Sequence, residues 1–271
     1  MKKNKKIRIS PETISLPCCG VDSHAHLSLK NFQNNLNQVL KRANRCGVQY
    51  IGNVFLSCDE FIKNVNNLKN KNIFFILGIH PHDGQKLGVK EIEKIRQICL
   101  EYDIKAIGEI GLDYYYNFSE PKIQQKIFEY QINLALELNK PIVIHSREAK
   151  EDTFAILNNF KKINKCLFHC FSYGKSEIRK ILDQGWSVSF SGAITFKKSQ
   201  ELQEIAKYTP IRHILLETDC PYLTPEPYRG KKNEPAFIVF SAYKLAFLKK
   251  KNVIDIWYYT GQNAKKFFNI I

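Results

Sequence analysis

The sequence contains no long apolar run. No stretch of its 271 residues approaches the roughly 18 to 20 apolar residues that a membrane-spanning helix needs. The first ten residues, MKKNKKIRIS, are basic, and no apolar core of a secretory signal follows them. These absences predict that the protein does not enter a membrane and that its location is cytoplasmic.

The eight cysteines are scattered, with no CxxC pair and no zinc-knuckle spacing. This pattern predicts reduced, mostly buried thiols and no disulfide framework. The chain also contains no linker-like stretch that would divide it. We therefore expect a single domain over residues 20–271, preceded by a basic N-terminal extension at residues 1–19 that forms an unpaired tail.

Acidic residues are few, because 26 Asp and Glu face 41 Lys and Arg, which gives a formal net charge of +15. A positive field of this size would attract nucleic acid, which is an anionic polymer. A general drift of composition towards Lys, Asn and Ile would produce the same charge spread over solvated helix faces. The net charge alone leaves both interpretations open.

Short β-branched or aromatic runs alternate with longer polar segments of helical period, which is typical of repeated βα units around a parallel sheet. The strands are expected at residues 21–27, 48–55, 73–80, 104–112, 141–145, 166–171, 186–190 and 213–219. Helices are expected at 31–46, 59–70, 89–102, 120–139, 148–162, 176–184, 200–208, 236–250 and 253–268. The α/β pattern also fits a doubly wound open sheet, but a count of eight strands favours a closed (β/α)8 TIM barrel.

The active site of such a barrel lies at the carboxyl ends of the strands. Six of the seven histidines fall at or near these ends, and only His213 begins its strand. The histidines at strand ends are His24, His26, His80, His82, His145 and His169. Glu109, Glu217 and Asp219 add carboxylates to the same rim, so the sequence predicts a metal site there.

Alternation along the first strand places His24 and His26 on one side, where both imidazoles can bind one cation. Four histidines and two carboxylates exceed the four ligands of a tetrahedral zinc site but suit two ions about 3.5–4 Å apart. The predicted ligands are His24, His26, Glu109, His145, His169 and Asp219. Glu109 is expected to bridge the ions, with His24, His26 and Asp219 on one and His145 and His169 on the other.

The remaining polar residues near the rim are not predicted to be metal ligands. His80 and His82 are expected to contact substrate or to support a ligand. Asp22 lies deeper on the same side as the two histidines of its strand and is interpreted as a buried polar partner. Glu217 could orient a ligand or help to position water. Cys170 should point away from His169 and is interpreted as a structural thiol.

These residues stand in motifs that resemble the TatD family of metal-dependent hydrolases, whose members are often described as deoxyribonucleases. The resemblance runs from about residue 21 to residue 268. The motifs are DSHAHL at 22–27, GIHPH at 78–82, GEIGLDY at 108–114, PIVIHSR at 141–147, FHCF at 168–171, LETDCPYLTP at 216–225 and RGKKNEP at 229–235. The resemblance implies the same six metal ligands that the barrel argument predicts. It also favours phosphodiester chemistry, since many related amidohydrolases place a carbamylated lysine where Glu109 stands.

The sequence departs from the family pattern in three places. The basic extension precedes a strand that usually begins almost at the N-terminus, and Tyr173 stands where Gly commonly occurs. Lys232 replaces a frequent Arg, which keeps the positive charge but loses bidentate contact with phosphate. None of these changes falls on a predicted ligand.

We therefore expect a metal-dependent deoxyribonuclease with two divalent ions per subunit, which could be zinc, manganese or magnesium. Glu109 and Asp219 are the expected catalytic residues, and His80, Arg147 and Arg229 are expected to bind a DNA substrate. One alternative is a hydrolase of a small ester, an amide or a tRNA-linked substrate. The other is a basic nucleic-acid-binding protein with structural metals. No obligate protein partner is evident.

Overall fold

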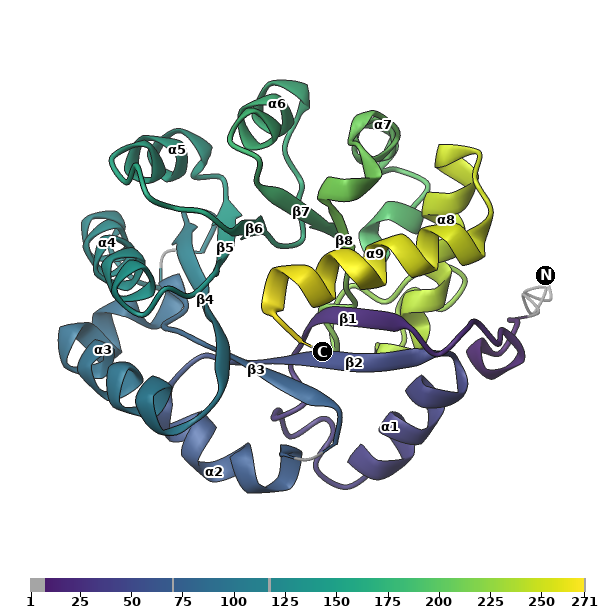
Figure 1. Ribbon diagram of the computed structural model, residues 1–271, viewed down its shortest axis with the longest axis horizontal. Coiled ribbons are helices and arrows are strands. Elements are labelled where there is room, and N and C mark those ends of the chain that lie inside the picture. Colours follow the sequence, from purple (N-terminus) through teal and green to yellow (C-terminus); the bar gives the residue numbers. More distant parts are fainter. Residues whose placement is uncertain (1–7, 70, 117, 271) are drawn as a thin grey trace, which may run out of the picture.

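The computed structural model describes residues 8–69, 71–116 and 118–270, and within these ranges eight parallel strands lie in one sheet in sequence order. The strands are β1 Gly20–Ala25, β2 Val48–Phe55, β3 Ile73–Leu77, β4 Ile104–Asp113, β5 Ile142–Arg147, β6 Cys166–Phe168, β7 Ser187–Phe190 and β8 Ile214–Leu216. The helices are α1 Leu36–Arg45, α2 Cys58–Leu68, α3 Gly84–Glu101, α4 Pro121–Glu137, α5 Lys150–Asn158, α6 Lys175–Asp183, α7 Gln200–Tyr208, α8 Ile238–Lys249 and α9 Val253–Phe268. The helices α1 to α7 alternate with the strands and surround them (Figure 1).

The sheet closes between its first strand and the segment that follows its last strand. The N–H of Asp219 donates to the carbonyl of His24 at 2.9 Å, and the N–H of His26 donates to the carbonyl of Cys220 at the same distance. Ala25 and Cys220 form the corresponding parallel bridge. The predicted TIM barrel is therefore confirmed, and the open doubly wound sheet is not.

The predicted strands are all present, but several end earlier than expected. The third, sixth and eighth strands stop at Leu77, Phe168 and Leu216, so their polar residues stand in the loops just beyond. The fourth strand instead runs one residue further than predicted, to Asp113. These shifts move side chains relative to the strand ends without changing the order of the elements.

The interior of the barrel is filled by apolar side chains, one or two from most strands. Burying such side chains stabilises the fold by roughly 25 cal/mol for each Å² of apolar surface removed from water. The described members of this inner cluster are Val21, Val54, Phe74, Ile76, Ala106, Val143, Leu167, Leu215, Ala264, Phe267 and Phe268. The last three belong to α9, so this helix supplies part of the barrel's own core.

Helix α9 covers the amino-terminal end of the barrel, and in Figure 1 it lies across β1. Asn263 donates to the carbonyls of Ile211 and Ile214 just before and at the start of β8. A Cβ added at Gly261 would lie 2.3 Å from the carbonyl oxygen of Cys19. The helix therefore rests directly on the backbone of the strand ends, and the opposite, carboxyl-terminal end is left for a site.

Residues 8–19 are not the unpaired tail that we expected. The indole N–H of Trp257 donates to the carbonyl of Pro17 at 2.8 Å, and Leu16 is buried. Nearer the start, Arg8 donates to the carbonyl of Pro227 at 3.1 Å, and the hydroxyl of Tyr228 donates to the carbonyl of Ile9 at the same distance. The segment therefore contacts the loop before α8 through one donated and one accepted hydrogen bond, and it contacts α9 through the carbonyl of Pro17. The first seven residues of the expected extension lie outside the described residues.

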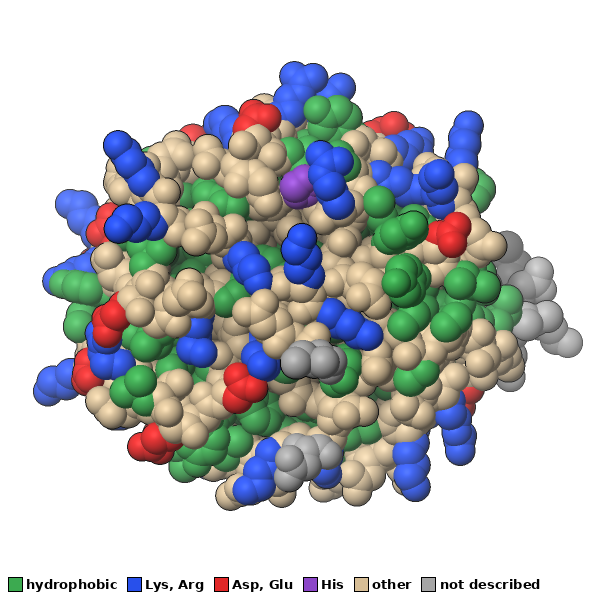
Figure 2. All heavy atoms as spheres, viewed as in Figure 1, with side chains coloured by type: hydrophobic (Ala, Val, Ile, Leu, Met, Phe, Trp, Pro, Cys, Tyr) green, Lys and Arg blue, Asp and Glu red, His purple; other side chains and the backbone are tan. Residues whose placement is uncertain are grey.

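Positive side chains are spread over the face of the molecule shown in Figure 2, with acidic side chains between them. On this face the charge is not gathered into one patch, which fits the interpretation of a compositional drift. No helix among the described residues is long and apolar enough to cross a membrane.

Replacing Gly261 by Ala should destabilise the protein, because the new Cβ would press on the backbone oxygen of Cys19 and lift α9 from the barrel. We expect a loss of about 1–3 kcal/mol in the free energy of unfolding, as is typical of overpacked sites. Chemical denaturation monitored by circular dichroism measures it. Gly84→Ala is the matched control, because a Cβ there would meet its nearest atom at an ordinary 3.7 Å. Equal stability of both variants would contradict the close packing of α9.

Candidate metal centre

The histidines of the first strand face the carboxylate that follows the last strand. His24 lies in β1, His26 follows its end, and both are buried. His26 Nε2 lies 3.3 Å from Asp219 Oδ1, and His24 Nε2 lies 4.0 Å from the same oxygen. The two hydrogen bonds that close the barrel therefore also bring these three side chains together.

The carboxylate of Glu109, near the end of β4, stands between two sets of imidazoles. Its Oε2 lies 3.3 Å from His24 Nε2 and 3.9 Å from His26 Nε2. Its Oε1 lies 2.6 Å from His145 Nδ1 and 2.7 Å from His169 Nε2. Each oxygen of one carboxylate thus faces a different pair of potential ligands.

The donor atoms form three overlapping groups whose members lie within 4.8 Å of one another. The groups are His24–His26–Asp219, His24–Glu109–His169 and His80–Glu109–His145. All six predicted ligands are therefore brought together. The third group contains His80, for which we expected contact with substrate rather than a place beside Glu109.

His24 provides a test of whether these residues suit a metal. Its ring is fully buried, and neither ring nitrogen has a hydrogen-bond partner among the described residues, although Nε2 lies close to Glu109. A buried nitrogen without a partner costs about 1–3 kcal/mol. Imidazole and carboxylate groups at this spacing are ligands that divalent transition metals accept, so the residues fit such an ion.

The two carboxylates of the centre stay ionised. Burial by itself would raise the pKa of Glu109, but the surrounding imidazoles hold it well below its usual range. Burial likewise acts to raise the pKa of Asp219, and His26 and His24 outweigh it, so this pKa is also lowered. The centre therefore presents two negative charges at neutral pH.

Burial acts to lower the pKa of every imidazole of the centre and the carboxylates act to raise it, and the balance differs from one ring to the next. Burial lowers the pKa of His24, and the nearby His169 lowers it further. Burial also lowers the pKa of His80, to about 4. For His26, His145 and His169, the adjacent carboxylates overcome burial and raise the pKa. Without a bound cation, part of the centre therefore holds protons between its carboxylates and imidazoles.

Asp113 is a functional neighbour that sequence reasoning missed. Its Oδ2 lies 2.9 Å from His145 Nε2 and 2.9 Å from His82 Nε2, while Oδ1 accepts from the N–H groups of Tyr115 and Tyr116. Asp113 therefore holds the ring of His145 on the side opposite Glu109. It lies one residue beyond the predicted end of this strand, nearer than His82 lies to the predicted end of its own strand, so the rule of strand-end position could have found it.

Two buried glutamines of α4 hold the loops around the centre. Gln131 accepts from the N–H of Ile79 at 2.7 Å and donates to the carbonyl of the same residue, directly before His80. Gln124 accepts from the N–H of Asp113 at 2.8 Å and donates to its carbonyl at 3.0 Å. The positions of His80 and Asp113 are thus fixed from the outer helix layer.

Carboxylates beneath the centre support the ligands from inside the barrel. Glu217 Oε1 lies 3.5 Å from His169 Nδ1 and accepts from the N–H of Cys170 at 2.7 Å. Asp22 accepts from the N–H and the hydroxyl of Thr218. Burial raises the pKa of Asp22 to about 8. Both carboxylates contact the backbone of the segments that carry His169 and Asp219.

The other residues singled out in the sequence lie in different places. Arg147 ends β5, and its guanidinium stacks on Tyr115 with 3.9 Å to the ring centroid. Arg229 stacks on Phe196 at 4.2 Å, and none of the interactions described for it joins it to the metal centre. His213 lies before β8 with its Nδ1 2.8 Å from the carbonyl oxygen of Trp186, away from the centre.

The thiol of Cys170 lies outside the groups of donor atoms. Its Sγ contacts the hydroxyl of Ser191 at 3.4 Å rather than an imidazole. None of the three groups found among the described residues contains a cysteine. The centre therefore consists of imidazoles and carboxylates.

The chain is similar to known proteins over most of its length. The model of the TatD-related DNase family matches residues 21–269. A metal-dependent hydrolase of Buchnera aphidicola is 38% identical, with 92% of this chain and 99% of that protein covered. A metal-dependent hydrolase of Escherichia coli K12 is 35% identical over 92% of this chain and 96% of that protein. A relative from Erwinia amylovora, named a 3'-5' ssDNA/RNA exonuclease, is 30% identical over 92% and 99%.

Among solved structures, a TatD homologue of Escherichia coli K12 matches with a TM-score of 0.89 and 23% identity. The match covers 94% of this chain and 99% of that one. A TatD-family hydrolase from Entamoeba histolytica matches with a TM-score of 0.83 and 24% identity over 94% and 99%. At this level of identity the two structures support the fold.

Metal affinity should fall as the pH is lowered. Imidazole binds a metal only when neutral, and the raised pKa values of His26, His145 and His169 in the metal-free protein let protons compete above the ordinary histidine value. We expect affinity to weaken steadily from about pH 8 to about pH 6, with protons released on binding. Titration calorimetry of the metal-free protein in buffers of different ionisation enthalpy measures both. His213→Gln, which removes a distant histidine, should leave the dependence unchanged. A flat profile over this range would contradict the role of the three imidazoles.

Proposed function

We propose that this chain, which belongs to the TatD family of metal-dependent hydrolases, is a deoxyribonuclease. Its proposed reaction is hydrolysis of phosphodiester bonds in single-stranded or frayed DNA. The observation that carries the proposal is the position of Glu109, whose two oxygens face separate sets of imidazoles. The proposed ligands of two divalent ions are His24, His26, Glu109, His145, His169 and Asp219.

Bound at this centre, such ions would supply activation of water and neutralisation of phosphate charge. The protein's own residues would do the rest. Asp219 is the more exposed of the two carboxylates, with 14% of its side chain accessible against 4% for Glu109. Because its pKa is lowered it is ionised, and we assign to it the acceptance of a proton from water at the mouth. Glu109, deeper and contacted by imidazoles at both oxygens, keeps the two halves of the centre in register.

Aromatic side chains beside the centre favour a nucleic-acid substrate. Tyr115, Tyr116 and Phe118 are exposed, and the rings of Tyr116 and Phe118 stack with centroids 5.5 Å apart. Both rings also contact the edge of His82, which Asp113 connects to the centre. Nucleobases of a single strand stack on such rings without regard to sequence. The Erwinia relative's name is consistent with this kind of substrate.

The three residues proposed to bind substrate differ in their support. Arg147 lies over Tyr115 and Tyr116, so it could contact a phosphate while the rings contact the bases. His80 is neutral at physiological pH, because burial lowers its pKa to about 4, and its Nε2 lies 3.4 Å from Glu109 Oε1. Arg229 is exposed beside Phe196, and its proposed contact is with a more distant part of a DNA strand.

Replacing Glu109 by Gln should abolish cleavage of single-stranded DNA while the protein stays folded. The amide keeps the size of the side chain but removes the charge between the two sets of imidazoles. We expect activity to fall by more than the roughly 10- to 100-fold that is typical of residues that only support a ligand. Cleavage of a labelled oligonucleotide and metal content, measured on the same preparations, test this.

The matched control for that experiment is Glu101→Gln, which removes an exposed carboxylate at the end of α3. It should retain full activity. Undiminished cleavage by the Glu109 variant would overturn the assignment. A third result is also informative: wild type and the Glu109 variant both fail to cleave DNA, but wild type hydrolyses a small ester or amide and the Glu109 variant does not. The centre is then hydrolytic and the proposed substrate is wrong.

Replacing both Tyr116 and Phe118 by Ala should raise KM for a single-stranded oligonucleotide about tenfold or more, since stacking contributes roughly 1–3 kcal/mol per base. The kcat and the hydrolysis of a small aryl phosphodiester, which carries no nucleobase, should change little. Steady-state kinetics on both substrates measures the difference. Tyr130→Phe, a change on an exposed ring of α4, serves as the control. An equal loss on both substrates would indicate damage to the centre instead of lost stacking.

A further inference from the structure

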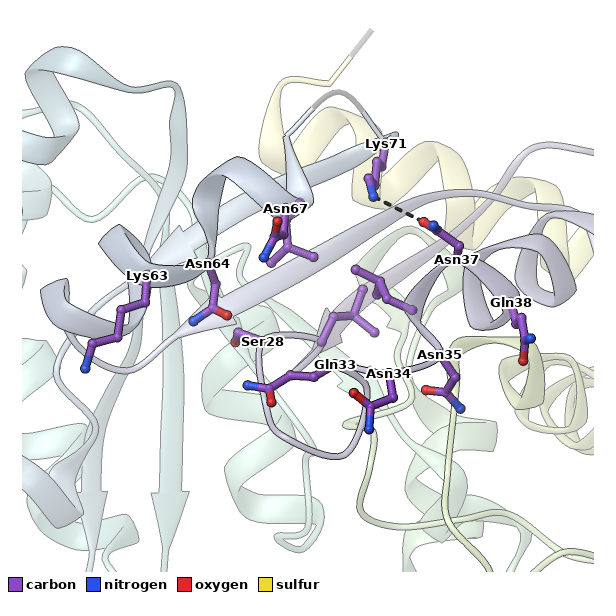
Figure 3. A pocket seen from close by; sticks show the side chains of 13 residues that line it. Ser28, Gln33, Asn34, Asn35, Asn37, Gln38, Lys63, Asn64, Asn67 and Lys71 are labelled. Atoms are coloured by element: carbon purple, nitrogen blue, oxygen red, sulfur yellow. Dashed lines mark hydrogen bonds between the residues drawn. The ribbon is translucent and has the colours of Figure 1, made fainter.

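A polar pocket lies beside the metal centre, between the segment that follows β1 and helix α2. We call it the α1–α2 pocket, and its volume is about 740 Å³. Leu27 and Ser28, which directly follow His26, form part of its wall. Figure 3 shows the side chains of α2 on one side and those of the segment before α1 on the other. None of the six proposed metal ligands lines the pocket, so it is separate from the centre. Along the chain, Leu27 and Ser28 of its wall are one and two residues from His26.

The wall of the α1–α2 pocket is made mainly of amide side chains and carries two positive charges. Lys63 and Lys71 are both exposed, and Lys71 donates to Asn37 at 3.2 Å. The described lining contains no carboxylate, in a chain that has 26 acidic residues. Its amides are Gln33, Asn34, Asn35, Asn37, Gln38, Asn64 and Asn67. Such a wall offers charge for phosphate and both donors and acceptors for the edges of nucleobases.

Groups within the pocket lack partners of their own. The Oδ1 atom of Asn35 is buried and accepts no hydrogen bond from the described residues. Asn35 is also the N-cap of α1, and its side chain does not cap the helix. The first N–H groups of a helix have no acceptor within the helix and favour an anion. Leu36 and Asn37, which begin α1, line the pocket, while the next N–H groups, of Gln38 and Val39, donate to the carbonyl of Asn35.

The α1–α2 pocket continues into a second hollow of about 550 Å³ on the outer side of α1. The two share Asn37 and Lys71. Lys41 adds further positive charge there, whereas the guanidinium of Arg45 is paired with Glu12 at 3.0 Å, and the described lining of this hollow has no carboxylate of its own. A polyanion that lies across the two hollows would therefore meet amide groups and the lysines of both walls.

We propose that the α1–α2 pocket binds the part of a single-stranded DNA that extends away from the metal centre. The proposal rests on the nuclease function proposed above and adds where the strand lies. Lys63 and Lys71 contact phosphates of the strand, and the amides contact base edges. One carboxylate borders the wall, because the oxygens of Glu60 accept from the hydroxyl of Ser28 and from the N–H of Leu56, so the phosphates of the strand lie at the lysines and not at Ser28.

The test is binding of a fluorescein-labelled 12-nucleotide DNA single strand with phosphorothioate linkages, which resist cleavage, to the protein as purified. Fluorescence anisotropy gives the affinity over a range of salt concentrations. For Lys63→Gln with Lys71→Gln we expect roughly tenfold weaker binding and a salt dependence reduced by about 1.4 in the log–log slope, since each phosphate contact to a single strand contributes about 0.7. Hydrolysis of bis(4-nitrophenyl) phosphate, too small to reach the pocket, should be unchanged.

The matched control is Lys161→Gln with Lys266→Gln, which removes two positive charges from exposed sites that line neither hollow. It should keep the wild-type affinity and slope. A second variant, Asn67→Trp, fills the pocket without changing charge and should weaken binding of the same strand. Circular dichroism confirms that each variant is folded.

Equal binding by wild type, the pocket variants and the control would overturn the proposal, as would wild-type protein that does not bind the strand. Failure of the nuclease function gives a different result. In that case wild type would not cleave the unmodified strand, while anisotropy would still report whether the pocket binds it.

Discussion

The hydrogen bonds that close the barrel are the constraint on which the site depends. Asp219 donates to the carbonyl of His24, and His26 donates to the carbonyl of Cys220, each at 2.9 Å. Three of the proposed ligands thus sit on the seam between the first strand and the last. If the barrel were open, His24 and Asp219 would lie at opposite edges of a sheet. The hydrogen bonds that close the barrel are therefore the ones that bring these three side chains together.

The seam brings together groups that would destabilise an ordinary core. Glu109 is almost fully buried among imidazoles, and both nitrogens of His24 lack partners among the described residues. Such desolvation is costly unless the charges are compensated. Stability is supplied at the other end of the barrel, where Phe267 and Phe268 of α9 complete the apolar interior. The apolar packing at the amino-terminal end therefore compensates for the charge that is buried at the carboxyl-terminal end.

The sequence was sufficient to predict eight strands and the meeting of six ligand residues, because period-two alternation and strand order determine both. Asp113 was not singled out, because the feature that distinguishes it is its contact with both His145 and His82, which strand-end position alone does not show. The prediction from sequence also misjudged residues 8–19, whose contacts depend on backbone carbonyls rather than on side-chain pattern. Asp219 has a φ of 53°, a left-handed conformation that composition does not indicate.

The α1–α2 pocket belongs to a further class of features that sequence pattern does not reveal. Its wall combines residues of two helices and a loop, and the property that distinguishes it is the lack of carboxylates in a defined volume. A net charge of +15 spread over the surface attracts any polyanion weakly and from every direction. Direction comes from local composition, because Lys63 and Lys71 stand in a wall whose described lining residues include no carboxylate, and this favours a phosphate there over other parts of the surface. The net charge therefore does not indicate where a DNA strand would lie on the protein. The positions of the acidic residues are more informative.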